Sequence, residues 1–503
     1  LTLNAANCTL SLSGTATTTF DSQLTLTSGT ILANDAAVDI DGNAGNSTGY
    51  TQSGGTYTGR SGADNFDKNF TVSGGTFTSG GGRMMNAASS AFSLSGTGIV
   101  DWSAADRVDL DTGTFVMSAG TFVATSNTMY SANSQWDITG GTFHHSSGTI
   151  EFDGNQVTQT DVNTSLTLAH VTLNRTSSWG PANAGDTITV TGTLKLLDGG
   201  LRGSGIVEAQ GDLWQSDADR VSAGYPSDGN LQFTGTANQT LYGWATPTGG
   251  DLPSITINKT GGTLTYGGGS TSSTFRMHFS NFTYTAGTVD PTTSSTFYFS
   301  GNSNANNYST LDAQGSSATS SFDNVQFVDY NFQLGGVLEV RGDLVFASGT
   351  LRTQANGIHL YEDWEFTSGT FSHGDGTVFF DGVNQTITGS TTFYGLTKST
   401  TTQATTLTFP AGVTTTMQGT MNLAGGSSAL LSLRSSTNGT QTYISPNGTR
   451  SISYLDVKDN NNISTTTIAA AGTNSTNSGN NTNWTFDNPT WSNLSLLALL
   501  DSS

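Results

Sequence analysis

Apolar and polar residues alternate along most of the chain, in short runs separated by Gly, Ser, Asn and Asp. Two of these runs are SLTLAHVTLNRT at 165–176 and SITINKT at 254–260, in which leucines and isoleucines recur at alternate positions. This alternation is typical of half-buried β-strands, and the turn residues mark where each strand ends. No stretch reaches the roughly 18 apolar residues of a membrane span. The pattern therefore predicts an all-β protein.

A short glycine-rich phrase returns along the first 150 residues, as SGGTYTG, SGGTFTS, SAGTFVA and TGGTFHH. Its apolar residue recurs at intervals of 26, 20, 22, 23 and 21 residues, at Ile31, Tyr57, Phe77, Ile99, Phe122 and Phe143. A period of this size predicts stacked solenoid coils. We expect glycine to supply positive φ at each corner, threonine to point outward, and the apolar residue to point inward and stack about 4.8 Å from its neighbour.

A longer unit follows, as in GTIEFDGNQ, NLQFTGTANQT, TFYFSGN and GTVFFDGVNQT, with shared glycines at Gly154, Gly235, Gly301 and Gly382. An Asn follows each glycine within three residues, which predicts an asparagine ladder that satisfies backbone groups of the turns. We predict a single long right-handed parallel β-helix (β-solenoid) with coils of about 20–26 residues. A string of β-sandwiches is the alternative fold.

The prediction divides the chain into three regions. Residues 1–150 form a β-solenoid of short coils, residues 151–486 form one of longer repeat units, and residues 487–503 form an apolar tail. Five leucines of this tail are predicted to cap the solenoid or to contact another subunit, because a solenoid end exposes strand edges: Leu494, Leu496, Leu497, Leu499 and Leu500.

Composition and net charge limit the classes of partner that the chain can bind. Only 11% of the 503 residues are charged, and the formal net charge is −21. This charge argues against nucleic acid and anionic membranes as partners. Cys8 is the single cysteine, so no internal disulfide forms, and we expect it to be a small buried residue. Because the sequence opens at Leu1 without a leader, we expect an export signal that was either cleaved or left out of this sequence, and hence a secreted protein.

Several short motifs are candidate binding sites. VDIDGN at 38–43 offers Asp39, Asp41 and Asn43 as an irregular Ca²⁺ site, and the sequence suggests no other cofactor. The tripeptide at 341–343, Arg-Gly-Asp, is familiar from adhesion ligands. The matching place in another unit reads AQGDLWQ, which favours a coil corner over an adhesion motif.

Histidines, basic residues and aromatic residues supply the remaining candidates. His145 and His373 both lie nine residues before a shared glycine, at places that other units fill with Pro or Thr, which favours a structural role. His144 beside His145 would face the opposite side of a strand. A polysaccharide lyase or hydrolase would need clustered carboxylates and a base. The basic residues in comparable strands are Arg175, Lys259 and Lys398, and the carboxylates are dispersed. Four aromatic residues would stack on sugar rings or, as we expect, fill wide coils: Trp214, Tyr242, Trp244 and Trp364.

Two stretches, GTVFFDGVNQTITGS and SYLDVKDNNN, resemble the coils of secreted bacterial surface proteins built as right-handed parallel β-helices, such as adhesins and autotransporter passengers. The resemblance implies an extracellular or cell-surface location and carries over no catalytic residue. We therefore expect a structural extracellular protein, a subunit of a bacterial surface filament, sheath or surface layer whose partners are copies of itself. The first alternative is a carbohydrate-binding adhesin stalk, and the second, less favoured one is a polysaccharide lyase or hydrolase. We do not expect the protein to be an enzyme.

Overall fold

The computed structural model describes residues 1–487, except 15, 35–36, 41–47, 60–63, 82–83, 87–89, 112, 133–134, 155–157, 175–176, 217–228, 246–249, 268–272, 301–307 and 314–320. The described residues are all-β, and their parallel strands stack as a β-solenoid of about 18 coils. They fall into two compact units, Leu1–Tyr298 and Phe299–Ser503, each of which is described by itself. β33 (Thr296–Ser300) contains the boundary between the units.

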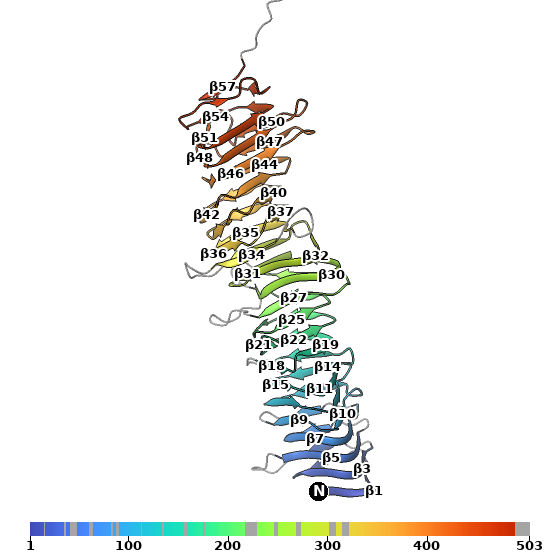
Figure 1. The fold of residues 1–503 in the computed structure, drawn as a ribbon. Helices are drawn as coiled ribbons and strands as arrows, with labels where there is room; N and C mark the ends of the chain where they lie inside the picture. The colour runs from blue at the N-terminus through green and yellow to red at the C-terminus, as the bar shows by residue number, and fades with distance from the viewer. Residues whose placement is uncertain are drawn as a thin grey trace, which may run out of the picture. The chain divides into compact units, whose positions relative to one another are not determined.

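Three columns of parallel strands build the first unit, and Figure 1 shows β3, β5, β7 and β9 side by side in its blue part. The first column is β1 (Thr2–Leu12), β3 (Leu24–Ala33), β5 (Thr48–Gly59), β7 (Asn69–Thr78), β9 (Ala91–Leu94), β12 (Thr114–Met117), β15 (Gln135–Ile138), β18 (Thr158–Val162), β21 (Ser177–Pro181) and β24 (Gly199–Leu201), joined at its edge by β10 (Ile99–Asp101), β13 (Thr121–Val123) and β16 (Thr142–His144). The second column is β2 (Thr18–Phe20), β4 (Val38–Ile40), β6 (Asp64–Phe66), β8 (Met84–Asn86), β11 (Arg107–Leu110), β14 (Thr128–Ser131), β17 (Thr149–Phe152), β20 (His170–Leu173), β23 (Leu194–Leu196), β26 (Leu213–Gln215) and β28 (Gln239–Trp244). The third is β19 (Ser165–Leu168), β22 (Thr187–Val190), β25 (Ile206–Ala209), β27 (Asn230–Phe233), β30 (Ser254–Tyr266) and β32 (Phe282–Pro291). β31 (Ser273–His278) pairs with β28 of the second column and with β29 (Asp251–Leu252).

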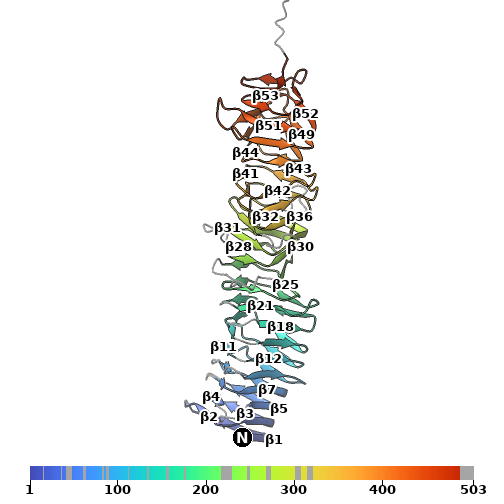
Figure 2. The same cartoon turned by 90° about the vertical axis from the view of Figure 1, so that its left-hand side faces the viewer.

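The second unit repeats this construction, and the turned view of Figure 2 shows β49 and β52 close together in its red part. One column is β35 (Asn324–Asp329), β38 (Leu344–Phe346), β41 (Trp364–Phe366), β44 (Asn384–Thr388), β47 (Thr405–Phe409), β50 (Leu431–Ser435), β53 (Leu455–Val457) and β56 (Thr476–Asn477). Another is β37 (Leu338–Val340), β40 (Ile358–Leu360), β43 (Thr377–Phe380), β46 (Gly395–Ser399), β49 (Thr420–Ala424) and β52 (Thr449–Ser453). The others are β34 (Ser309–Asp312), β36 (Asn331–Leu334), β39 (Thr350–Arg352) and β42 (Thr370–Ser372); β45 (Thr392–Phe393), β48 (Thr414–Met417), β51 (Thr442–Pro446) and β54 (Asn460–Asn462); and β55 (Ile468–Ala469) with β57 (Trp484–Thr485).

Parallel pairing decides between the two folds that the sequence left open. A chain of β-sandwiches pairs its strands antiparallel, whereas the named strands of the described residues pair in parallel and join residues about one coil apart. The solenoid prediction is confirmed, and the sandwich alternative is wrong. The predicted change of repeat style near residue 150 stays a prediction, and the tail from 488 onward lies outside the described residues.

The predicted column of stacked residues is confirmed with one correction. Tyr57 pairs with Phe77, and their rings lie parallel with centroids 4.4 Å apart. The next member is Val100 and not Ile99, because Phe77 and Phe122 both pair with Val100. Val100 is fully buried, whereas Ile99 is 38% exposed. Both residues are apolar, so alternation alone could not choose between them.

A second aromatic column runs beside the first and was missed from the sequence. Tyr50, Phe70, Phe92, Phe115 and Trp136 follow one another in register from β5 to β15. Their rings stack with centroids 4.6–5.4 Å apart. The signal was present in the sequence as an aromatic residue seven or eight positions before the inward residue of the phrase, from Tyr50 to Trp136. The two columns pack side by side in the core of the first coils, and Phe66 of β6 packs against both.

The glycines of the phrase adopt positive φ, as predicted, but they lie inside continuous strands and not between strands. Gly55 and Gly75 have φ of 68° and 77°, in the left-handed region that glycine tolerates. The strand register shifts between Gln52 and Thr56, so the corner is an irregularity within β5. A Cβ on Gly75 would lie 2.3 Å from the carbonyl oxygen of Gly55. The coils therefore approach each other too closely at this corner for any side chain.

Candidate functional site

The four aromatic candidates separate into two groups. Trp364 on β41 is fully buried and its indole N–H donates to the hydroxyl of Thr391 at 3.1 Å, so the expectation that it fills the coil is correct. Trp214, Tyr242 and Trp244 instead face outward and are partly exposed, since they alternate with buried neighbours on β26 and β28. For these three residues the expectation was wrong, because it ignored which side of the strand each one occupies.

The three outward rings, here called the aromatic strip (Trp214, Tyr242 and Trp244), touch one another. The Trp214 ring lies 4.0 Å from the Tyr242 ring and 5.5 Å from the Trp244 ring, centroid to centroid, with interplanar angles of 24° and 22°. Strand register places Trp214 against Tyr242 in the next coil and against Lys195 in the previous one. Lys195 is exposed. The strip is therefore a small apolar surface bordered by a cation.

Two of the candidate catalytic bases, Lys259 and Lys398, lie inside the coils. Lys398 is 1% exposed, and its Nζ donates to Gln385 Oε1 and Gly382 O, both at 2.7 Å, and to Phe380 O at 3.3 Å. Desolvation lowers the pKa of Lys398 from 10.5 to about 8. Three acceptors match the three donors of an ammonium group. The arrangement holds a buried charge in place and gives no access to a substrate.

Lys259 repeats this arrangement in the first unit, which shows that it belongs to the repeat. Its Nζ contacts Gln239 Oε1 and donates to Ala237 O at 3.0 Å, and desolvation lowers its pKa. In both copies the glutamine amide also donates to two backbone carbonyls of the previous coil, at 2.7–2.9 Å. The Lys–Gln pair thus pins three chain segments together. Arg175, the third basic candidate, lies outside the described residues.

Asparagines and aspartates at the corners bind the backbone of the next coil. Asn238 accepts from Thr263 N–H, and Asn384 from Thr406 N–H, both at 3.0 Å. This supports the part of the ladder prediction in which the asparagines satisfy backbone groups. In the Arg-Gly-Asp stretch, Asp343 accepts from the N–H of Asp363 at 3.0 Å, and Asp212 of the matching stretch accepts from its next coil at 2.8 Å. The equivalent contacts support the corner interpretation over an adhesion motif.

The two histidines at equivalent repeat positions, His145 and His373, make equivalent turn contacts. The Nδ1 of His145 accepts from Ser147 N–H at 3.1 Å, and the Nδ1 of His373 accepts from Asp375 N–H at 3.3 Å. The residue two places after each histidine has positive φ. A shared turn contact explains why the histidines recur at this place, as the structural interpretation expected.

Other sequence candidates are only partly described. Asp39 lies on β4 and accepts from Asn65 Nδ2 at 3.2 Å, whereas Asp41 and Asn43 lie outside the described residues, so the Ca²⁺ site stays a prediction. The five leucines of the tail also lie outside them. Cys8 is exposed, which corrects the expectation of a buried thiol. Among the described residues no three His, Cys, Asp or Glu side chains come together as a metal site.

A buried carboxyl lies in the first coils. Asp64 on β6 is 1% exposed, accepts from the Tyr57 hydroxyl at 2.8 Å and lies 3.5 Å from the Gly80 nitrogen. Desolvation raises the pKa of Asp64 from 3.8 to about 6, although both hydrogen bonds act to lower it. Sequence pattern gave no sign of this group, because its partner Tyr57 reaches it from across the coil.

A carboxylate shared by two basic side chains joins β29 and β31. Asp251 pairs with the Arg276 guanidinium, and its other oxygen lies 3.0 Å from His278 Nδ1. A carboxylate–histidine pair also orients general bases in enzymes. Here the same carboxylate carries the nearly buried Arg276, so the contact is best described as an ion pair that ties neighbouring strands.

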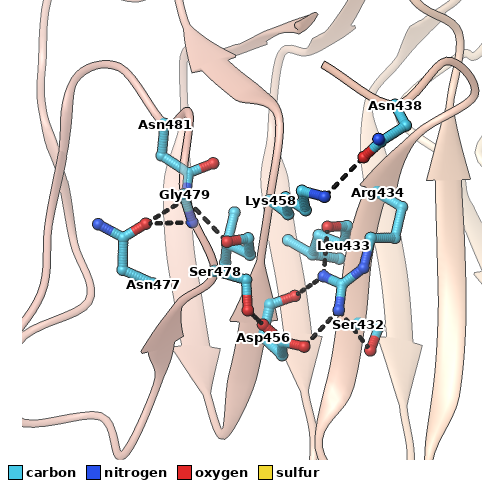
Figure 3. A network of polar contacts seen from close by, with 11 residues as sticks. Ser432, Leu433, Arg434, Asn438, Asp456, Lys458, Asn477, Ser478, Gly479 and Asn481 are labelled. Atoms are coloured by element: carbon cyan, nitrogen blue, oxygen red, sulfur yellow. Dashed lines mark hydrogen bonds and ion pairs between the residues drawn. The ribbon is translucent and has the colours of Figure 1, made fainter. Parts of the chain in front are cut away.

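Polar side chains connect the last coils of the second unit. Figure 3 shows the Arg434 guanidinium against Asp456, which also accepts from the Ser478 hydroxyl at 2.5 Å. Beside them Lys458 donates to Asn438 at 2.6 Å, and Asn481 donates to Asn477 at 2.7 Å. These contacts span three successive coils. They connect neighbouring coils on the outer surface of the unit, in the part of the chain that contains SYLDVKDNNN.

Comparisons with known proteins give no relative for this chain. No family model matches it, no curated protein matches it, and no solved structure matches it. Among the described residues, no helix has the length and apolar character needed to cross a membrane.

Proposed function

We propose that the chain is a structural protein of the cell exterior, a subunit of a bacterial surface filament, sheath or layer that assembles through contacts between solenoids. One observation carries the proposal: within each unit, the same coil is laid down repeatedly, with inward packing columns and strand-to-strand hydrogen bonding from one coil to the next. Because each coil contacts mainly its neighbours, such an array gains stability coil by coil. The cell-surface location rests on the resemblance of the repeat motifs.

The inner contacts suit a load-bearing role. Each fully buried aromatic or aliphatic side chain contributes about 1.5–3 kcal/mol relative to an exposed one, and the coils of the first unit carry several apiece, such as Tyr50 and Tyr57 in one coil. Buried Lys–Gln pairs add hydrogen bonds that a local opening would have to break. Many side chains of the described residues thus contribute to contacts between neighbouring coils.

Assembly is tested by sedimentation and electron microscopy of the full chain over a range of concentrations. We expect filaments or layers to form, and we expect substitution of Leu497 and Leu500 by Ser to weaken them if the tail makes the contact. A matched control replaces the exposed residue Val383 by Ser. A full chain that stays monomeric at the highest concentration reached, with no ordered material in micrographs, would contradict the proposed function.

A further inference from the structure

The aromatic strip breaks the rule that governs its surroundings. Outward positions of nearby strands carry polar side chains, such as Lys195, Glu208 and Gln232. Trp214, Tyr242 and Trp244 lie on the same outward side and keep apolar surface in contact with water. Contiguous exposed apolar surface of this kind marks binding sites more often than chance.

The stack of outward rings stops after Tyr242, and the side chain of Ser273 fills the space next to the following residue, Gly267. The ladder pairs Leu241 with Tyr266, and the N–H of Gly267 donates to the Leu241 carbonyl at 2.7 Å. Gly267 is therefore the next residue in the column of Tyr242, and it has no side chain to continue the stack. The column of Trp244 continues with Thr274, which brings a hydroxyl group next to the indole.

We propose that the aromatic strip binds a neutral oligosaccharide made of β-linked hexopyranose rings with equatorial substituents. Such a sugar has flat faces lined by axial C–H groups, which pack on an aromatic face, and a rim of hydroxyl groups, which hydrogen-bond to polar neighbours. Tyr242 and Trp244 supply the flat faces, and Lys195 and Thr274 supply polar groups at the border. This binding site goes beyond the scaffold role.

Size and charge favour a sugar over other occupants. An aromatic side chain offers about 150–250 Å², and these three are only partly exposed, so the strip falls well below the roughly 800 Å² per partner of a stable protein interface. The net charge of −21 disfavours anionic polysaccharides and nucleic acids. A neutral glycan needs neither a large area nor a basic surface.

Calorimetric titration of the full chain with cellohexaose tests the site, with maltohexaose as the stereochemical control because its rings are joined through axial bonds. We expect cellohexaose to bind at millimolar or lower concentration and maltohexaose to bind more weakly. Tyr242→Ala and Trp244→Ala should each weaken cellohexaose binding about tenfold, and Tyr242→Phe should keep it within about twofold, because the ring remains. The matched control is Tyr361→Ala, which removes an exposed aromatic ring from the second unit and should change nothing.

Two kinds of result would overturn the proposal. One is the absence of cellohexaose binding at millimolar concentration, or binding that the two alanine variants and Tyr361→Ala affect equally. The other is a change in the sedimentation of Trp244→Ala without any glycan binding to the parent chain, which would assign the strip to contact with a second copy. Circular dichroism of each variant checks its fold, and because the two alanine variants are independent, either one tests the site where the other unfolds.

Discussion

Asp64 makes the stability of the first coils depend on pH in a direction that the structure predicts. Its carboxyl is buried, and desolvation raises its pKa from 3.8 to about 6. A raised pKa means that the folded chain holds the proton more tightly than the unfolded chain. The stabilisation from this group is therefore complete below pH 3.8 and is lost as the pH rises through 6.

The size of the effect follows from the same pair of pKa values. Each unit of pKa corresponds to about 1.4 kcal/mol, so the ionised Asp64 costs the folded state about 3 kcal/mol above pH 6. Asp64→Asn removes the charge and keeps a similar shape. Its amide can donate to the Tyr57 oxygen while its carbonyl accepts from Gly80 N–H, so both contacts survive. We expect the variant to be more stable than the parent at pH 7.5, by up to about 3 kcal/mol, and to lose this advantage near pH 3.5.

Hydrogen exchange of peptides covering residues 50–80 is the suitable assay, because a long repeat array need not unfold in one step. The opening free energy of Asp64→Asn is compared with that of the parent at each pH, so that other titrating groups cancel. An Asp39→Asn variant serves as the control, since Asp39 lies on the outward side of β4. A difference between Asp64→Asn and parent that stays constant from pH 3.5 to 7.5 would show that the reasoning about the buried carboxyl is wrong.

Further predictions concern register, glycine corners and the buried lysine. Val100→Ala should lower the unfolding free energy by about 2 kcal/mol, whereas Ile99→Ala should change it by less than about 0.5 kcal/mol; equal effects in urea unfolding would contradict the register. Gly75→Ala should cost more than about 3 kcal/mol, because it combines positive φ with a collision against Gly55 O. Gly412→Ala, with φ of 67° and nothing within 4 Å, should cost only about 1 kcal/mol when both glycine variants are compared in urea unfolding. Because the pKa of Lys398 is lowered to about 8 in the fold, the unfolded chain binds more protons between pH 8 and 10.5, and stability should rise with pH across that window. Lys398→Met should remove this rise, by about 3 kcal/mol in denaturant titrations, and a variant with an unchanged pH profile would refute it.

The local sequence pattern was sufficient to predict the fold class of this chain. The alternation of polar and apolar residues and the glycine pairs act over a few positions, so the strands, the corners and the coil period follow from neighbouring residues alone. The column from Tyr57 to Phe122 was found for this reason. Comparison of equivalent positions between repeats also indicated that His145 and His373 are turn residues and not catalytic residues.

Tertiary structure decided what depends on pairing between coils. Ile99 and Val100 are both apolar, and only the strand register selects the buried one. Trp214 and Trp364 have the same side chain, yet one faces water and the other fills the core. Lys398 finds its acceptors on segments 13 to 18 residues away. Sequence specifies local conformation, whereas burial, charge environment and exposed rings arise only when one coil is placed against the next.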